Sequence, residues 1–291
     1  MIYLFGSIIF SAYLVLALKY IDNKGVSTFE ALTFNYCTCV VIGSLLNHSF
    51  PISVETLSQP WFIWSIVMGA SFIFTFNLIG ITVQKNGVSV ASVANKLSLV
   101  IPFLFSLYLY HEYAGWIKWL GVAIALIAVY CTCFSTHNNT HKKPVVWIRY
   151  GLPIMLFVCS GLLDTFIKYI EKHYLTDSNN NSFLASTFFV AATISFLGVL
   201  YKHIIKKHFF QWKTVVAGIA IGIPNYFSIW CFLQVLKKYT THSSTIIPIN
   251  NMGIVLVSTI VSTLLFREKL SIVNWIGVLL SIIAIACIAY G

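Results

Sequence analysis

Two ionisable residues, Lys96 and Asp164, stand inside long apolar stretches of the sequence. A charged side chain in the hydrocarbon core of a membrane costs about 2.5–3.5 kcal/mol by insertion measurements, so such residues usually face a partner, a cavity or a substrate pathway. The ammonium group of Lys96 could bind the carboxylate or phosphate of a small solute. The carboxyl group of Asp164 could neutralise a cation or carry a proton.

Each of these residues also has structural alternatives. Lys96 could form an ion pair with Asp164, or its aliphatic stem could carry the ammonium towards the membrane surface. Asp164 has a second neighbour in Lys168, four residues further on and on the same face of a helix. If Asp164 pairs with Lys168, Lys96 is left for a substrate anion. If Asp164 titrates, it could couple transport to protons.

Neutral polar residues elsewhere in the apolar stretches could line the same site. They are Asn35, Asn77, Asn95, Asn225, Asn250 and Asn251. The alternative for each is a hydrogen bond between helices, worth under about 1 kcal/mol on average in membranes. Tyr226 and Trp230 lie four residues apart and could stack on a ligand, although such aromatics also serve as packing and interface groups. The seven cysteines have no zinc or iron–sulfur spacing, so no metal or cofactor is expected.

The elements that would position these groups are membrane-spanning helices. The chain has 291 residues, of which 58% are hydrophobic and 9% are charged, whereas a soluble domain carries roughly 25% charged residues. Its mean hydropathy is +0.86. The long unbroken apolar runs lack the alternation of barrel strands and therefore favour helices. The net charge of +10 comes mostly from short connections, so it indicates membrane topology and not nucleic-acid binding.

Ten stretches are long enough to cross a membrane, which requires about 20 apolar residues. They cover residues 2–20, 29–47, 61–84, 88–110, 115–134, 148–171, 182–204, 212–237, 241–266 and 271–290. We expect interruptions at Gly87, at 111–115 and at 267–270. Four prolines lie inside the stretches, where each removes a backbone hydrogen bond and can kink the helix. They are Pro102, Pro153, Pro224 and Pro248.

The sequence contains an internal repeat. In the later part of each half, Asn95 aligns with Asn251, Glu112 with Glu268, Trp119 with Trp275 and Gly121 with Gly277. In the earlier part, Ser11 aligns with Ser160 and Lys19 with Lys168. We therefore divide the chain into a first repeat (1–134), a polar linker (135–147) and a second repeat (148–291). Because each repeat holds an odd number of spans, the second enters the membrane from the opposite side. Inverted repeats of this kind recur in secondary transporters.

Two further patterns bear on helix packing and orientation. Small residues form faces around Gly121 and Gly277, and again at Gly218 and Gly222, which predicts close helix contacts. A homodimer contact through such a face is the alternative. Twelve of the Lys and Arg residues in the connections lie on one side of the membrane and five on the other. This bias predicts that the first side is cytoplasmic and that both termini lie outside.

The end of each half resembles a known family. The second half reads Lys238-Tyr239-Thr240-Thr241-His242-Ser243-Ser244, then Leu265-Phe266-Arg267-Glu268-Lys269-Leu270, then Trp275-Ile276-Gly277-Val278. The first half reads Asn86-Gly87-Val88-Ser89-Val90-Ala91-Ser92, then Leu109-Tyr110-His111-Glu112, then Trp119-Leu120-Gly121. These segments are similar to the end of an EamA-type domain of the drug/metabolite transporter superfamily. We interpret Glu112 and Glu268 as capping or turn residues.

The resemblance implies ten helices in two inverted five-helix repeats, a central cavity between the halves, and export or exchange of small solutes. It also implies cytoplasmic termini, the opposite of the charge bias. Together with the residues above, it predicts an all-α membrane protein that transports a small metabolite by alternating access. A basic residue at mid-membrane depth favours an anionic or zwitterionic solute.

Other functions are open at this point. No P-loop is present, so ATP hydrolysis is not expected. We do not expect an enzyme, although a lipid-modifying membrane enzyme and a non-transporting scaffold are the alternatives. The expected partners are the solute and the lipid bilayer, with no nucleic acid, and the expected location is the bacterial inner membrane.

Overall fold

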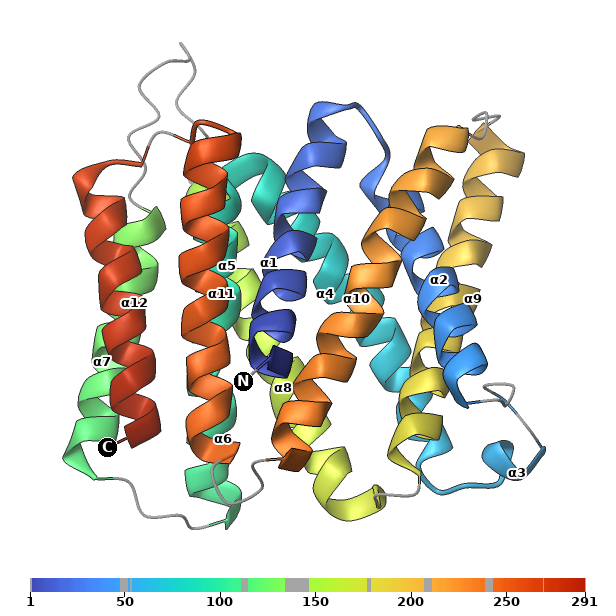
Figure 1. Ribbon diagram of the computed structural model, residues 1–291, viewed down its shortest axis with the longest axis horizontal. Helices are drawn as coiled ribbons and strands as arrows, with labels where there is room; N and C mark the ends of the chain where they lie inside the picture. Colours follow the sequence, from blue (N-terminus) through green and yellow to red (C-terminus); the bar gives the residue numbers. More distant parts are fainter. Residues whose placement is uncertain are drawn as a thin grey trace. The chain divides into compact units, whose positions relative to one another are not determined.

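The computed structural model describes residues 2–47, 52, 54–110, 115–133, 147–176, 179–206, 211–238, 243–268 and 270–290. Within these ranges the chain is helical and has no strand (Figure 1). The helices are α1 (Ile2–Asn23), α2 (Thr28–Asn47), α3 (Val54–Leu57), α4 (Phe62–Asn86), α5 (Val88–Leu97), α6 (Val100–Tyr110), α7 (Trp116–Cys133), the π-helix η1 (Trp147–Gly151), α8 (Leu152–Tyr174), α9 (Asn180–Lys206), α10 (Trp212–Lys238), α11 (Ser243–Leu265) and α12 (Ile272–Tyr290).

The described helices agree with the expected all-α membrane protein. Nine segments in the described part of the chain are long and apolar enough to cross a membrane. The tenth expected span coincides with α11, whose apolar stretch Ile249–Leu265 is shorter than the other nine. A multi-pass helical membrane protein therefore follows from the fold, while ten crossings stay a prediction. The π-helix and the four-residue helix α3 were not foreseen in the sequence.

The chain divides into two compact units, and each unit takes segments from both halves of the sequence. The first unit consists of Met1–Lys19, Leu78–Thr165 and Ser228–Gly291. The second consists of Tyr20–Asn77 and Phe166–Phe227. The division of the sequence into repeats at the polar linker remains a prediction.

In the first unit, α7 packs closely against α12 (Figure 1). A methyl group added at Gly121 would lie 2.9 Å from the Cβ atom of Cys287. One added at Gly277 would lie 2.8 Å from the backbone nitrogen of Thr132. The predicted small-residue faces thus let these helices approach closely. The contacts are reciprocal, because Gly121 aligns with Gly277 in the internal repeat and each glycine faces the far end of the other helix.

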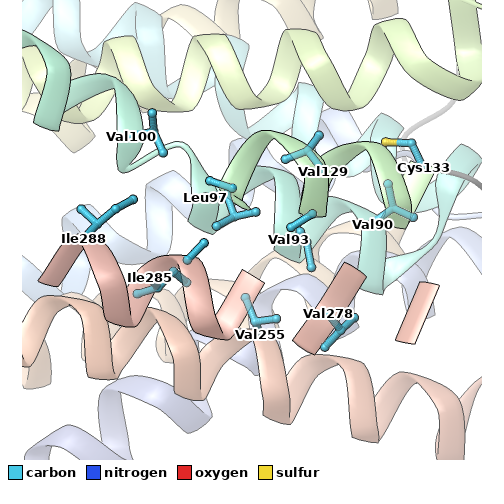
Figure 2. Close-up of a cluster of buried hydrophobic side chains, with 13 residues drawn as sticks. Val90, Val93, Leu97, Val100, Val129, Cys133, Val255, Val278, Ile285 and Ile288 are labelled. Atoms are coloured by element: carbon cyan, nitrogen blue, oxygen red, sulfur yellow. The ribbon is translucent and has the colours of Figure 1, made fainter. Parts of the chain in front are cut away.

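Apolar side chains from five helices fill the core beside this pair (Figure 2). They include Val90, Val93 and Leu97 of α5, Val100 of α6, Val129 and Cys133 of α7, Val255 of α11, and Val278, Ile285 and Ile288 of α12. The side chain of Leu97 is fully buried. One face of α5 is therefore fixed by this cluster.

The first turn of α5 is held by a carboxylate from the other end of the sequence. Gly87 has a φ of 96°, a conformation that favours glycine, and it separates α4 from α5 as expected. Oε1 of Glu268 accepts the Val88 backbone N–H at 2.8 Å, and Oε2 accepts the Ser89 hydroxyl at 3.3 Å. An anion at a helix N-terminus satisfies unpaired donors and complements the helix dipole. The interpretation of Glu268 as a capping residue is confirmed, while Glu112 lies outside the described residues.

The start of α8 is stabilised by an asparagine of α4. Pro153 has no N–H, so it cannot donate to the carbonyl of Arg149 in α-helical pairing or to that of Ile148 in π-helical pairing. The Nδ2 atom of Asn86 donates to both of these carbonyl oxygens, at 3.0 Å to Ile148 and 3.1 Å to Arg149. One side chain thus replaces the hydrogen bonds that the proline removes.

In the second unit, α2 packs against α9 and α10. Gly218 and Gly222 of α10 lie directly against the α2 backbone around Ala31 and Asn35, so this small-residue face also serves helix packing. The hydroxyl of the buried Tyr36 donates to the Phe72 carbonyl at 3.1 Å. The second unit is therefore a tightly packed helical body whose buried tyrosine has its polar atom satisfied.

Candidate functional site

The stretch 88–110, expected as one helix, is broken at Ser98 and Leu99, where α5 ends and α6 begins. Pro102 explains the position of the break. It cannot donate to the carbonyl four residues earlier, and its ring clashes with that carbonyl, which belongs to Ser98. The Ser98 oxygen instead accepts the Ile101 N–H at 2.9 Å, as in a tight turn. The break lies two residues beyond Lys96.

Helix α8 crosses directly over this break. A methyl group added at Gly161 would lie 2.5 Å from Cδ1 of Ile101 and 2.7 Å from the carbonyl oxygen of Ser98. Any side chain at position 161 would push the two segments apart. Gly161 therefore allows the contact that brings Asp164, three residues further along α8, beside the end of α5.

Lys96 and Asp164 interact electrostatically across this contact. Asp164 also shares a hydrogen bond with the Ser98 side chain, whose hydroxyl donates to the Asn95 carbonyl at 2.5 Å. The side chain of Lys96 is half-buried. The side chain of Asp164 keeps exposed surface. The structure thus brings together the two ionisable residues singled out in the sequence.

A buried hydroxyl lies on the same face of α8, one turn before Asp164. Ser160 is 3% exposed, and its Oγ atom has no hydrogen-bond partner among the described residues. Leaving such a donor unpaired costs about 1–3 kcal/mol. Ser160 is therefore a polar group available to a molecule that enters this site.

The charged pair takes one residue from each sequence repeat, and the two positions related to it by the repeat are both apolar. By the alignment of Asn95 with Asn251, Lys96 corresponds to Met252. By the alignment of Ser160 with Ser11, Asp164 corresponds to Val15. A role in general helix packing would serve both repeats equally. The helix packing common to both repeats therefore does not explain why Lys96 and Asp164 are charged.

Four further predicted site residues belong to the same unit as Lys96. Asn95 is half-buried and its carbonyl accepts the Ser98 hydroxyl. Asn250 of α11 is 5% exposed, and its Oδ1 atom is buried without a partner among the described residues. Asn251 is half-buried beside it. Trp230 packs edge-on against Tyr3, with ring centroids 5.7 Å apart.

The remaining predicted residues belong to the second unit, where helix packing accounts for their contacts. Asn77 donates to the Ile73 carbonyl one turn earlier at 2.7 Å. Asn225 donates to the Oδ1 atom of Asn35 at 3.0 Å, a hydrogen bond between α10 and α2. Tyr226 lies against Gly43, and Lys168 of α8 has an exposed side chain. These contacts favour the helix-packing alternative for Asn35, Asn77, Asn225 and Tyr226.

Three residues of the site were missed in the sequence. Ser98, Ser160 and Gly161 are small and common in membrane helices, so their types alone carry little signal. Pro102 was the available signal, because it forbids a regular helix at the residue four positions before it. No group of His, Cys, Asp and Glu residues suited to a metal ion occurs within the described ranges.

An apolar multi-pass helical fold with a charged pair at a helix break defines an integral membrane protein. Residues 149–290 match the EamA-like transporter family, which belongs to the drug/metabolite transporter superfamily. The resemblance seen in the sequence is therefore confirmed for this part of the chain.

Similarity to other proteins extends over almost the whole chain. An uncharacterized protein of Haemophilus influenzae is 24% identical, with 98% of this chain and 96% of the relative covered. A protein of known crystal structure shares the fold with a TM-score of 0.58 and 17% identity, covering 98% of this chain and 94% of that one.

Proposed function

We propose that this protein is a secondary transporter that moves a small anionic or zwitterionic metabolite across the membrane. The EamA-like family of residues 149–290 supports transport as the activity. The single observation that carries the substrate class is Lys96, an ammonium group placed beside a helix break among apolar helices. Broken helices with exposed backbone groups are a recurring form of substrate site in transporters.

The site has the groups that an anion requires. Lys96 supplies positive charge, and the unpaired hydroxyl of Ser160 can donate a hydrogen bond to a carboxylate or phosphate oxygen. The side chain of Asp164 keeps exposed surface, so a solute at this site can reach it. The contact of Gly161 with Ile101 and Ser98 holds this part of α8 beside the helix break.

Alternating access around this site is the mechanism that we infer. The aligned sequence halves and the reciprocal contacts of Gly121 and Gly277 support an inverted repeat, whose two halves can exchange conformations. The helical fold and the bacterial relative support a location in the bacterial inner membrane.

The proposal is tested by uptake into proteoliposomes of four radiolabelled probes, namely inorganic phosphate, succinate, glutamate and alanine. Tetraphenylphosphonium serves as a cationic comparison. The native chain is compared with Lys96→Gln, Lys96→Arg and, as a matched control, Lys213→Gln, which removes an exposed charge. Loss of a charged hydrogen bond costs about 1.5–3 kcal/mol, so Lys96→Gln should lower uptake about 10- to 150-fold. Lys96→Arg keeps the charge and should retain part of the activity.

Two results would contradict the proposal. If none of the four probes moves, the proposal that the protein transports small anions or zwitterions is wrong. The alternatives are then a non-transporting scaffold and a lipid-modifying enzyme. If a probe moves equally well through the native chain and Lys96→Gln, transport stands but the anion site at Lys96 does not.

A further inference from the structure

We propose that Asp164 competes with the transported anion for Lys96, so that the anion is carried together with a proton on Asp164. This inference rests on the proposed function and names the force that drives it. A difference in pH across the membrane would then power accumulation of the solute.

The competition follows from the charges at the site. The contact of Gly161 with Ser98 and Ile101 brings Asp164 beside the end of α5, where its charge and that of Lys96 act on each other. While Asp164 is ionised, its negative charge offsets the ammonium that an incoming carboxylate or phosphate must use. A proton from the aqueous side to which the site is open, bound to one Asp164 oxygen, leaves Lys96 uncompensated. The anion and the proton bind as a pair and leave as a pair on the other side.

The hydrogen bonds around Asp164 suit both of its protonation states. The Ser98 hydroxyl has one proton, and the Asn95 carbonyl accepts it at 2.5 Å. The Ser98 oxygen then offers only lone pairs to Asp164, and a protonated carboxyl can donate to them. When Asp164 is ionised, Ser98 can turn its proton towards the carboxylate instead. Ser98 therefore supports a change of charge at Asp164 without leaving either state unpaired.

The part of α8 around Asp164 contacts α5 and α6 at Gly161 and α4 at Phe166, and these segments carry few ionisable groups. On α4 the charged residue is Lys85, near its C-terminal end, with an exposed side chain. From α5 the facing charge is Lys96. Helix α6 carries no charged residue, and its titratable residues are the tyrosines at positions 108 and 110, near its far end. On α8 itself, Lys168 follows one turn later with an exposed side chain. The change of charge at Asp164 therefore acts chiefly on Lys96.

The alignment of the sequence repeats supports a functional pair. Val15 and Met252 occupy the corresponding positions, so the repeat has apolar side chains there. Replacing a buried ion pair by apolar residues is often neutral or stabilising. Proton-coupled transport would explain why Lys96 and Asp164 carry opposite charges, whereas helix packing alone does not explain it.

The test uses proteoliposomes of the full chain with the membrane potential held at zero by valinomycin and equal potassium. The probes are again inorganic phosphate, succinate, glutamate and alanine. With the interior one pH unit more alkaline, one-to-one symport predicts about tenfold accumulation, since one pH unit is a tenfold difference in proton activity, about 1.4 kcal/mol. Asp164→Asn should accumulate no probe above equilibrium yet still exchange internal for external probe. Glu55→Gln, which changes an exposed carboxylate on α3, should accumulate like the native chain.

Each result decides the inference. The same Asp164→Asn chain should bind the transported probe with an affinity independent of pH, whereas the native affinity should rise as the pH falls. If a probe moves in a Lys96-dependent manner but neither the pH gradient nor Asp164→Asn affects its accumulation, the proton coupling is wrong and the proposed function survives. If no probe moves at all, the proposed function and this inference fall together.

Discussion

At the scale of single residues, Lys96 and Asp164 are charged groups whose transfer from water into apolar helices costs free energy. Both lie in helices that are apolar along most of their length, and both correspond to apolar residues in the other repeat. The Coulomb attraction of a buried pair often only compensates for the loss of hydration, so stability does not explain why the pair is present. Removing one partner is a different matter, because it leaves the other charge without compensation.

Exchange of this pair for its apolar counterparts should therefore separate folding from transport. The double variant Lys96→Met with Asp164→Val should unfold at or above the temperature of the native chain in detergent, since both residues already pack well at positions 252 and 15. Lys96→Met alone should unfold at a lower temperature, because Asp164 loses its positive partner. Thermal unfolding followed by gel filtration measures both effects. The double variant should carry none of the four probes.

A lower unfolding temperature for the double variant than for Lys96→Met would contradict this account, because the pair would then be a structural element. The matched control is Glu55→Gln on α3, where an exposed carboxylate is neutralised and no change is expected.

At the scale of helices, periodicity and composition predicted where each helix lies, while the interruptions needed local stereochemistry. The ends of α2, α4 and α10 agree with the expected spans to within a few residues, because apolar length alone decides them. The break at Ser98 was not predicted, because its flanking residues are apolar and Pro102 is the one sequence feature that indicates it. The approach of Gly161 to that break depends on a contact between distant segments. Such contacts leave no periodic signal, so Asp164 could be singled out but not placed.

The start of α8 offers a second example of a proline compensated from elsewhere. Because Asn86 donates to the two carbonyls to which Pro153 cannot donate, the two residues should be energetically coupled. Asn86→Leu should lower the free energy of unfolding by about 1–3 kcal/mol by removing these two hydrogen bonds. In a Pro153→Ala background the restored N–H can serve one of them, so the same Asn86→Leu change should cost less.

A double-mutant cycle in detergent, read as the unfolding temperatures of the four chains, measures this coupling. Equal costs of Asn86→Leu in both backgrounds would show that the amide acts independently of the proline.

At the scale of the whole molecule, the membrane topology links the repeat to the mechanism. A duplicated segment with five crossings must be inverted, and inverted repeats around a central site are a recurring basis of alternating access. The reciprocal contacts of Gly121 and Gly277 and the capping of α5 by Glu268 tie the two sequence halves together within the first unit. These contacts join parts of the chain that must lie at matching depths, so topology is where the inverted repeat can be tested directly.

Single cysteines introduced at Asn138 and Asn180 should label from opposite sides of the membrane, because the one helix between these positions, α8 with its π-helical start, is a candidate span. A membrane-impermeant maleimide applied to intact cells and then to opened membranes reads the side of each. The native cysteines among the described residues are buried or half-buried in helices, so their background should be low. The charge bias predicts that position 180 reacts from outside and position 138 only after opening. The reverse pattern would place both termini in the cytoplasm, as the family resemblance implies. Reaction of both positions from the same side would contradict a membrane crossing by α8. The predicted odd number of crossings in the second repeat, and the inverted repeat that supports the proposed alternating access, would then be wrong.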